Sequence, residues 1–260
     1  MPPAPLQLFW KVWYQYLSSH IGNEVIFLNY GFYPPEGNII DLHPEDEPNR
    51  PAIQLYHHVA SAADLKDKHV LEVSCGHGGG ASFVKRYHKP KAYTAVDQNP
   101  KAINFNRKAH GALGIDFRVG DAQALDFPEQ HFDAVLNVEA SHCYPRQLDF
   151  FKSVHHVLKN DGHFLYTDFR TAENAPVLDR DLHTAGFKVK SKTDITPHVV
   201  EALKHTSARY RGFVNKYMPK YMPKIMSPVF EKFAGVEGSA VYNWFTTRYY
   251  IYYSYTLVKV

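Results

Sequence analysis

One run of the sequence, VLEVSCGHGGG at residues 70–80, limits most strongly what this chain can fold into. It predicts a buried strand, an acidic residue near the strand's end, a turn of small residues and then a helix. Small residues let a ligand approach the backbone closely, and free N–H groups at a helix start attract electron-rich atoms. The run therefore predicts a nucleoside-type ligand at the carboxyl edge of a parallel sheet.

The glycines alone do not choose the ligand, because Gly76, Gly78 and Ala81 also fit the loose pattern of dinucleotide-binding proteins. Glu72 argues against a dinucleotide. Near the end of the first strand, its carboxylate can meet a cationic amino group but would repel a pyrophosphate. The alternative for Glu72 is a salt bridge at the strand end.

Two further acidic residues end the next two strands. Asp97 lies about 20 residues past the glycines, where a carboxylate can accept hydrogen bonds from both ribose hydroxyls. Asp121 can accept from an adenine amino group, and the Ala122 N–H can donate to a ring nitrogen. The alternative for both aspartates is a helix cap or a turn.

Together these features resemble the class I S-adenosylmethionine-dependent methyltransferases, from about residue 49 to residue 192. The resemblance implies that S-adenosylmethionine is the cofactor and that the loop and strand ends bind it. Ser74 departs from the family, which more often has glycine there, but a small residue still fits. The cofactor-binding residues implied up to this point are Glu72, Ser74, Gly76, Gly78, Asp97, Gln98, Asp121 and Ala122.

Strand and helix patterns alternate through the middle of the chain. Strands are expected at 69–73, 91–96, 114–119, 132–138, 162–168 and 186–193, with helices at 79–88, 99–110, 146–158 and 174–184. A further helix is expected from Pro51 to Ala63. This spacing predicts a doubly wound, mostly parallel α/β sheet. In the fold that the chain resembles there are seven strands, and the last, here at about 248–258, runs antiparallel.

The segments outside this alternation predict a helical lid. Residues 5–19 have the apolar spacing of an amphipathic helix, and 27–35 form a loop rich in Gly and Pro. Thr196 is expected to cap a helix that runs to about Val214.

We therefore divide the chain into four segments. These are an N-terminal helix and lid loop (1–48), a cofactor-binding core (49–194), a helical substrate or lid insertion (195–245) and the last core strand (246–260). The alternative is that these helices only cover a sheet edge.

The best candidate for a general base is His142, which follows the fourth strand. A neutral imidazole can take a hydroxyl proton near neutral pH. Asp168 ends the fifth strand, so in a parallel sheet it can orient His142 or share its proton. A nucleophilic Cys143 activated by His142 is disfavoured, because the side chains of adjacent residues rarely point at each other. A metal site formed by Glu139, His142 and Asp168 is conceivable, but no ligand spacing demands it. The alternatives are a solvent-facing His142 and a capping Asp168.

A narrower resemblance rests on NYGF at 29–32, IQLYHH at 53–58 and NVEASHCYP at 137–145. These segments resemble the phthiotriolone and glycopeptidolipid O-methyltransferases, which methylate hydroxyls of bacterial lipids and polyketide-derived chains. The resemblance implies that Tyr30 closes over the cofactor and that Asn137 and Glu139 line the sulfonium side. It also implies an O-methyltransferase acting on a hydroxyl of a hydrophobic small molecule, such as a lipid, a polyketide or another natural product.

Composition limits the partners. A net charge of +3 is too small to predict nucleic-acid binding. The basic stretch at 188–224 could contact an anionic membrane surface, although a solvated helix face is the alternative. Two cysteines, no signal pattern and no long apolar run predict a cytoplasmic protein that does not span a membrane. The oligomeric state stays open.

Other functions remain as alternatives. The same fold supports C- or N-methylation of a similar molecule, and N-methylation needs little beyond a neutral amine. A nicotinamide-dependent oxidoreductase is opposed by Glu72 and Asp121. A cofactor-binding protein without activity is opposed by the expected pairing of His142 with Asp168.

Overall fold

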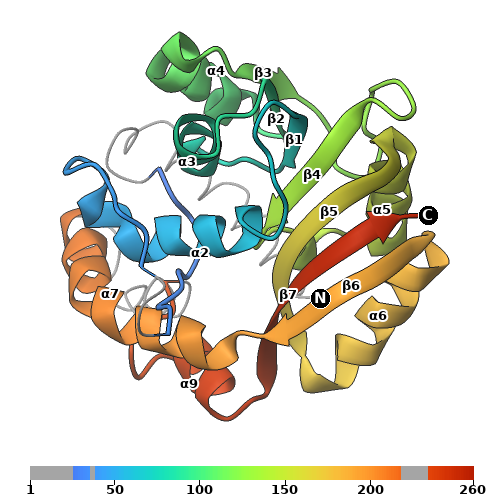
Figure 1. The fold of residues 1–260 in the computed structure, drawn as a ribbon. Coiled ribbons are helices and arrows are strands. Elements are labelled where there is room, and N and C mark those ends of the chain that lie inside the picture. The colour runs from blue at the N-terminus through green and yellow to red at the C-terminus, as the bar shows by residue number, and fades with distance from the viewer. Residues whose placement is uncertain (1–25, 36–38, 218–233) are drawn as a thin grey trace.

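The computed structural model describes residues 26–35, 39–217 and 234–260 (Figure 1). The described strands are β1 (His69–Val73), β2 (Ala92–Asp97), β3 (Asp116–Val119), β4 (Phe132–Val138), β5 (Leu158–Thr171), β6 (Phe187–Asp194) and β7 (Tyr250–Lys259). The described α-helices are α2 (Arg50–Ala60), α3 (Gly79–Tyr87), α4 (Pro100–His110), α5 (Gln147–Val157), α6 (Ala175–Thr184), α7 (Thr196–Tyr217) and α9 (Ala240–Thr246). Short 3₁₀ turns are η2 (Glu47–Asn49), η3 (Gly111–Leu113), η4 (Ser141–Cys143) and η5 (Ala172–Asn174).

The seven strands form one sheet in the order β3-β2-β1-β4-β5-β7-β6. The pairs β1–β2, β1–β4, β2–β3 and β4–β5 are parallel, whereas β7 runs antiparallel to both of its neighbours. The predicted doubly wound sheet with an antiparallel last strand is confirmed. The order reverses between β1 and β4, and ligands of such sheets bind at that point, outside the carboxyl ends of the strands.

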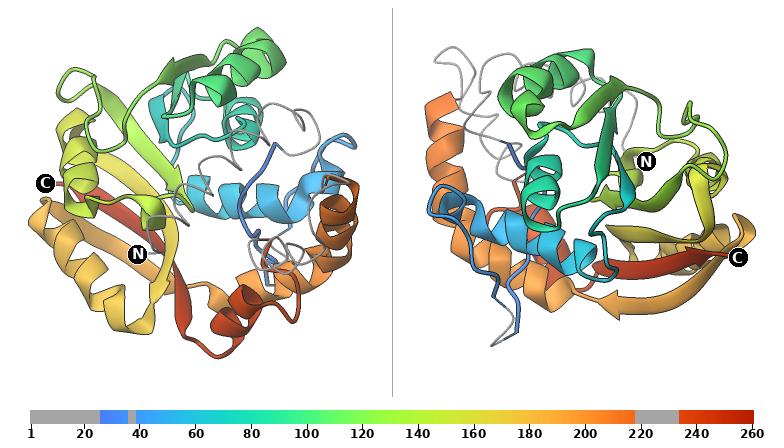
Figure 2. Two further views of the ribbon diagram at one scale, coloured as in Figure 1. Left: turned by 180° about the vertical axis from the view of Figure 1, so that it is seen from behind. Right: turned by 45° about the horizontal axis from the view of Figure 1, so that its top comes forward.

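Helices pack on both faces of the sheet through buried apolar side chains. Helices α2, α3, α7 and α9 pack on one face, where Ile53, Phe83, Leu203 and Phe245 are fully buried. Helices α5 and α6 pack on the other face through residues such as Phe151 and Leu182 (Figures 1 and 2). The parallel strands β1 and β4 are buried almost throughout because helices cover both of their sides.

Several expected boundaries were wrong. Strand β5 is longer than the predicted 162–168 because its two ends pair with different neighbours, Leu158 with Phe132 and Thr171 with Tyr250. Helix α2 ends at Ala60 instead of Ala63, and α9 lies at the end of the expected helical insertion, where no separate helix bounds were given.

The expected cap of α7 was also wrong. The Thr196 hydroxyl accepts from the Tyr252 N–H instead of capping the helix, and the Asp194 carboxylate accepts from the Thr196 N–H. The expected helix at 5–19 lies outside the described residues. Within the described ranges, no helix is both long and apolar enough to cross a bilayer.

Candidate active site

The turn between β1 and α3 is held in a conformation that favours glycine. Ser74, Gly76 and Gly78 have positive φ angles of 60°, 52° and 74°. Left-handed backbone is the reason that glycine is common at such positions, and Ser74 occupies it at some cost in strain. The Gly76 N–H donates to the Asp97 carboxylate at 2.9 Å, which ties the turn to the end of β2.

Two side chains of helix α4 bond to backbone carbonyls of the same turn. The Asn106 side-chain amide donates to the Gly76 carbonyl at 2.8 Å, and a ring nitrogen of His110 lies 3.1 Å from the His77 carbonyl. Asn106 is fully buried. Sequence reasoning missed both residues, because nothing in the spacing of α4 indicates which of its polar groups face the turn.

Glu72 lies in the core. Its two carboxylate oxygens accept from the hydroxyls of Tyr56 on α2 and Tyr93 on β2, at 2.8 and 2.9 Å, and its exposed fraction is 1%. Burial raises the pKa of Glu72 to about 7, although both hydrogen bonds oppose that shift. Gly80 makes room for Tyr56, since a Cβ there would lie 2.0 Å from the Tyr56 ring. The predicted contact of Glu72 with a cofactor amino group stays a prediction.

The other predicted cofactor residues follow the strand ends. Asp97 accepts from the Gly76 and Asn99 N–H groups, and burial raises the pKa of its carboxyl despite these bonds. Gln98 is exposed directly after β2. Asp121 is exposed and accepts from the Gln123 N–H, whereas Ala122 is buried. All four therefore lie at the same sheet edge, on β2 or just after β3.

Asn137, near the end of β4, has an unpaired acceptor. Its side-chain N–H donates to the Val73 carbonyl and the Tyr144 hydroxyl, at 2.9 and 3.1 Å. Its side-chain oxygen is buried without a hydrogen-bond partner. A buried acceptor of this kind is costly unless a ligand or water completes it. It lies between the ends of β1 and β4, where an ammonium or another donor of a bound cofactor would pair with it.

Glu139 links three elements that are distant in the sequence. It has a positive φ of 52°, and one carboxylate oxygen accepts from the Tyr30 N–H at 2.9 Å and the Tyr252 hydroxyl at 2.7 Å. Burial raises the pKa of Glu139 to about 8, against the effect of these two donors. Glu139 therefore joins the N-terminal segment to β7, whatever else it contacts.

Residues 26–35 cross the glycine turn. The Gly79 N–H donates to the Ile26 carbonyl at 3.2 Å, and a Cβ at Gly79 would lie 2.5 Å from that oxygen. The Tyr30 ring packs against Phe169 and Phe245, with centroids 5.8 and 5.6 Å apart. This position is compatible with a lid, and closure over the cofactor stays a prediction.

His142 and Asp168 meet at the ends of β4 and β5. Nδ1 of His142 lies 2.8 Å from one Asp168 oxygen, and the His142 N–H donates to the other oxygen at 2.8 Å. Asp168 is fully buried, while 28% of the His142 side chain is exposed. Burial alone would lower the pKa of His142, but the negative charges of the Cys143 thiolate and the Asp168 carboxylate outweigh it and raise that pKa well above its ordinary value.

Arg170 belongs to the same network, and sequence reasoning missed it. Its guanidinium lies 3.3 Å from the Asp168 carboxylate and donates to the Ser141 hydroxyl at 2.8 Å. Burial would raise the pKa of Asp168, yet His142 and Arg170 hold it well below its usual range. The carboxylate therefore stays ionised and fixes the imidazole, which leaves Nε2 as the nitrogen not bonded to Asp168.

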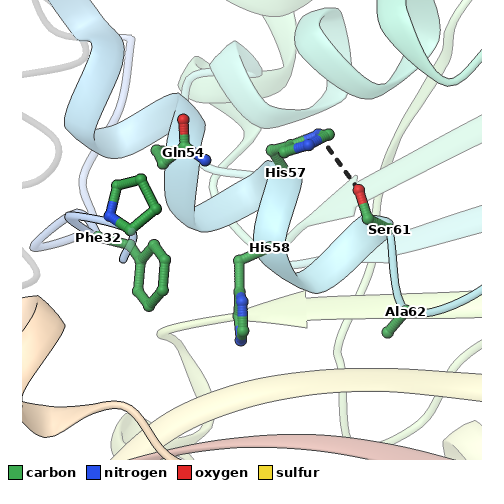
Figure 3. A pocket seen from close by; sticks show the side chains of 7 residues that line it. Phe32, Gln54, His57, His58, Ser61 and Ala62 are labelled. Atoms are coloured by element: carbon green, nitrogen blue, oxygen red, sulfur yellow. Dashed lines mark hydrogen bonds between the residues drawn. The ribbon is translucent and has the colours of Figure 1, made fainter. Parts of the chain in front are cut away.

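One cavity of about 180 Å³ lies elsewhere, along α2 (Figure 3). Its wall consists of Phe32, Pro34, Gln54, His57, His58, Ser61 and Ala62. None of the predicted site residues lines it. In the described ranges no three His, Cys, Asp or Glu side chains are grouped closely enough to hold a metal ion.

The fold and this sheet edge define an S-adenosylmethionine-dependent methyltransferase. A family described as a methyltransferase domain matches residues 71–166. The fatty-acid O-methyltransferase of Mycolicibacterium smegmatis is 44% identical over 80% of this chain and 77% of its own length. The phthiotriol/phenolphthiotriol dimycocerosates methyltransferase of Mycobacterium tuberculosis is 38% identical over 92% and 86%.

The fold comparison agrees. A putative sarcosine dimethylglycine methyltransferase from Galdieria sulphuraria superposes with a TM-score of 0.71, covering 95% of this chain and 97% of its own, at 15% identity. The chain belongs to the methyltransferase family that includes the fatty-acid and phthiotriol dimycocerosates enzymes. The predicted enzyme class and cofactor are therefore confirmed.

Proposed function

We propose that this enzyme methylates a hydroxyl group of a long-chain lipid, with His142 as the general base. The observation that carries the proposal is the contact between His142 Nδ1 and the buried Asp168 carboxylate. An amine that is already neutral needs no base for methylation, but an alcohol must lose a proton. Support for a lipid comes from the names of the relatives, a fatty-acid O-methyltransferase and a phthiotriol dimycocerosates methyltransferase.

The cofactor would lie over the glycine turn. Asp97 would accept from its ribose hydroxyls, while Asp121, Ala122 and Gln98 would lie beside its base. Ser74, Gly76 and Gly78 would let it approach the backbone, and Asn137, with its unpaired oxygen, would face its amino acid part together with Glu139. When bound, S-adenosylmethionine supplies an electrophilic methyl group on sulfur.

His142 would act on the other side of that methyl group. Nε2 takes the hydroxyl proton while the acceptor oxygen bonds to the methyl carbon and the carbon–sulfur bond breaks, so that S-adenosylhomocysteine leaves with a neutral sulfur. Asp168 holds the ring and stabilises the imidazolium that forms, and Arg170 keeps Asp168 ionised. Alignment and proton removal are the two contributions that this chain makes to the rate.

A carboxyl acceptor is the second candidate, and the raised pKa of His142 favours it. A cationic imidazole would attract a carboxylate, which has no proton to lose. The two candidates differ in the sign of their pH dependence. With an alcohol the rate rises as pH passes upward through the pKa of His142, because only the neutral ring accepts a proton. With a carboxylate the rate falls over the same range.

Hexadecanol and hexadecanoic acid make a matched pair for this test. We expect label transfer from methyl-labelled S-adenosylmethionine to hexadecanol, with a rate that increases with pH in wild type and loses that slope in His142→Gln. Transfer to the acid alone, with a rate that declines as pH rises, would replace the alcohol by the carboxyl acceptor. Transfer to neither lipid would overturn both.

A further inference from the structure

A row of aromatic rings runs from the candidate base to the protein surface. Phe169 follows Asp168 on β5, and its ring packs on His142 with centroids 4.3 Å apart. Tyr250, at the start of β7, packs on Phe169 at 5.1 Å, and Tyr249 packs on Tyr250 at 5.3 Å. Phe245 and Trp244 of α9 contact the same rings, at 5.4 Å from Phe169 and 5.9 Å from Tyr249 respectively. The row therefore spans several rings without a break.

Exposure increases from Phe169 outward, whereas 28% of the His142 side chain is exposed at the inner end. Phe169 is 9% exposed and Tyr250 is half-buried, whereas Tyr249 is 54% exposed. The Tyr249 ring, next to the half-buried Tyr250, offers a face on which an apolar chain can pack. The outer end lies where α9 passes into β7, at the end of β7 that pairs with the last residues of β5 (Figure 1).

Two guanidinium groups near the row are paired elsewhere. Arg170 follows Phe169, and because side chains alternate along a strand its guanidinium lies on the other face, with Asp168 and Ser141. Arg248, next to Tyr249, pairs with Asp194 at 2.5 Å. The rings between His142 and Tyr249 thus offer apolar faces, with the Tyr249 and Tyr250 hydroxyls as their own polar atoms, and the exposed Thr246, Thr247 and Glu173 border the outer end. The apolar faces suit a flexible hydrocarbon chain better than a sugar or a peptide, which need directional hydrogen bonds.

We propose that the rings of Tyr250 and Tyr249, packed on the buried Phe169, bind the hydrocarbon chain of the acceptor, with its reactive end at His142 and its far end at Tyr249. The inference rests on the proposed function and adds to it a dependence on chain length. Each methylene that the rings cover should tighten binding about fourfold, until the chain reaches past Tyr249. Tyr249 then determines how strongly the enzyme prefers long chains over short ones.

The test compares hexadecanol with octanol in wild type and three variants. Tyr249→Ser should raise KM for hexadecanol about 3- to 10-fold and leave KM for octanol and kcat for both unchanged. Tyr249→Phe keeps the ring and should behave as wild type. Tyr253→Ser is the matched control, since this tyrosine packs on the opposite face of the sheet, and it should alter neither KM. Circular dichroism checks that each variant is folded.

Direct binding separates this inference from the proposed function. Calorimetry with hexadecanol on the enzyme saturated with S-adenosylhomocysteine needs no turnover. Weaker binding by Tyr249→Ser, with no methylation of any alcohol, would support the chain site and reject the proposed reaction. Equal hexadecanol affinity in wild type and Tyr249→Ser, or equal affinity of wild type for octanol and hexadecanol, would overturn the chain site even if methylation occurs.

Discussion

The cofactor side and the acceptor side of the sheet edge are built in different ways. On the cofactor side, at the ends of β1 to β3, Asp97 and Asp121 each accept from the N–H group two residues further along the chain. On the acceptor side, at the ends of β4 and β5, the contacts join distant segments. Glu139 bonds to Tyr252, 113 residues away, and Asp168 to His142, 26 residues away. Local turns thus contribute more to the cofactor side, although Asp97 also bonds to Gly76 across 21 residues, and the acceptor side holds the longest of these contacts.

The largest effect expected from a single change is on the acceptor side. His142→Ala should slow the chemical step by roughly 10²–10⁴-fold, because the acceptor proton loses its base, while cofactor affinity changes little. Single-turnover rates with hexadecanol and calorimetry with S-adenosylmethionine measure the two quantities.

Asp168→Asn is the companion variant. It should also slow the step, but by less if Asp168 only orients the ring. A near-normal rate in His142→Ala with no rate in Asp168→Asn would exchange the two roles. Normal rates with hexadecanol in both variants would mean that neither side chain removes the proton, and would overturn the roles assigned to His142 and Asp168.

The cofactor side should show its largest effect in stability. The pKa of Glu72 is about 7 in the folded protein and near 4.5 when unfolded. Below pH 4.5 both states carry the proton, and as pH rises to about 7 only the unfolded state releases it. The free energy of unfolding should therefore fall by about 3 kcal/mol across this window, and Glu72→Gln should remove that fall.

Urea unfolding across the same pH range measures this difference. Subtracting the Glu72→Gln curve from the wild-type curve removes the contributions of all other titrating groups that the substitution leaves unchanged. Parallel curves would show that Glu72 is ionised in the folded protein, and that the tyrosine hydroxyls compensate for its burial.

The next largest effect is expected on the affinity for the cofactor. Asp97→Ala removes the acceptor of the Gly76 N–H and the predicted acceptor of the ribose hydroxyls, so S-adenosylmethionine should bind roughly 10- to 150-fold more weakly. Asp116→Ala is the control, because Asp116 is exposed and pairs with Arg118 at 2.6 Å. Unchanged affinity in a folded Asp97→Ala enzyme would remove the ribose assignment.

The same contrast explains what the sequence could predict. The glycine turn and the carboxylates after β2 and β3 lie within short segments whose residue types imply their geometry, and the sheet follows from the alternation of helices and strands. The pairing of His142 with Asp168 was predictable too, since parallel neighbours end at one edge.

Other contacts between distant segments could not be predicted. Arg170 carries no local signal, because its role depends on which residues of β4 and η4 lie beside it. Glu72 looked like an edge residue, yet Tyr56 and Tyr93 hold it in the core. The row from Phe169 to Tyr249 exists only because β7 inserts between β5 and β6, a pairing that side-chain periodicity does not encode.

The smallest expected effects come from two tyrosines that each donate to a buried carboxyl, one on the cofactor side and one on the acceptor side. They test the difference between the two sides most directly. Tyr93 donates to Glu72 on the cofactor side and Tyr252 donates to Glu139 on the acceptor side, at 2.9 and 2.7 Å. Burial raises the pKa of both carboxyls, to about 7 and about 8, so in mildly acidic buffer both hydrogen bonds join neutral groups. Each Tyr→Phe change should then lower the free energy of unfolding by about 0.5–1.5 kcal/mol.

Their effects on function should separate even though their effects on stability match. Tyr93→Phe loosens Glu72 beneath the glycine turn, so it should weaken S-adenosylmethionine binding by roughly 2- to 10-fold and leave the acceptor KM unchanged. Tyr252→Phe loosens Glu139, which also holds the Tyr30 N–H and is expected to line the sulfonium side, so it should raise the acceptor KM by a similar factor in addition to weakening cofactor binding. If Tyr93→Phe also raises the acceptor KM, the two sides do not act separately, and the division between a cofactor side and an acceptor side is wrong.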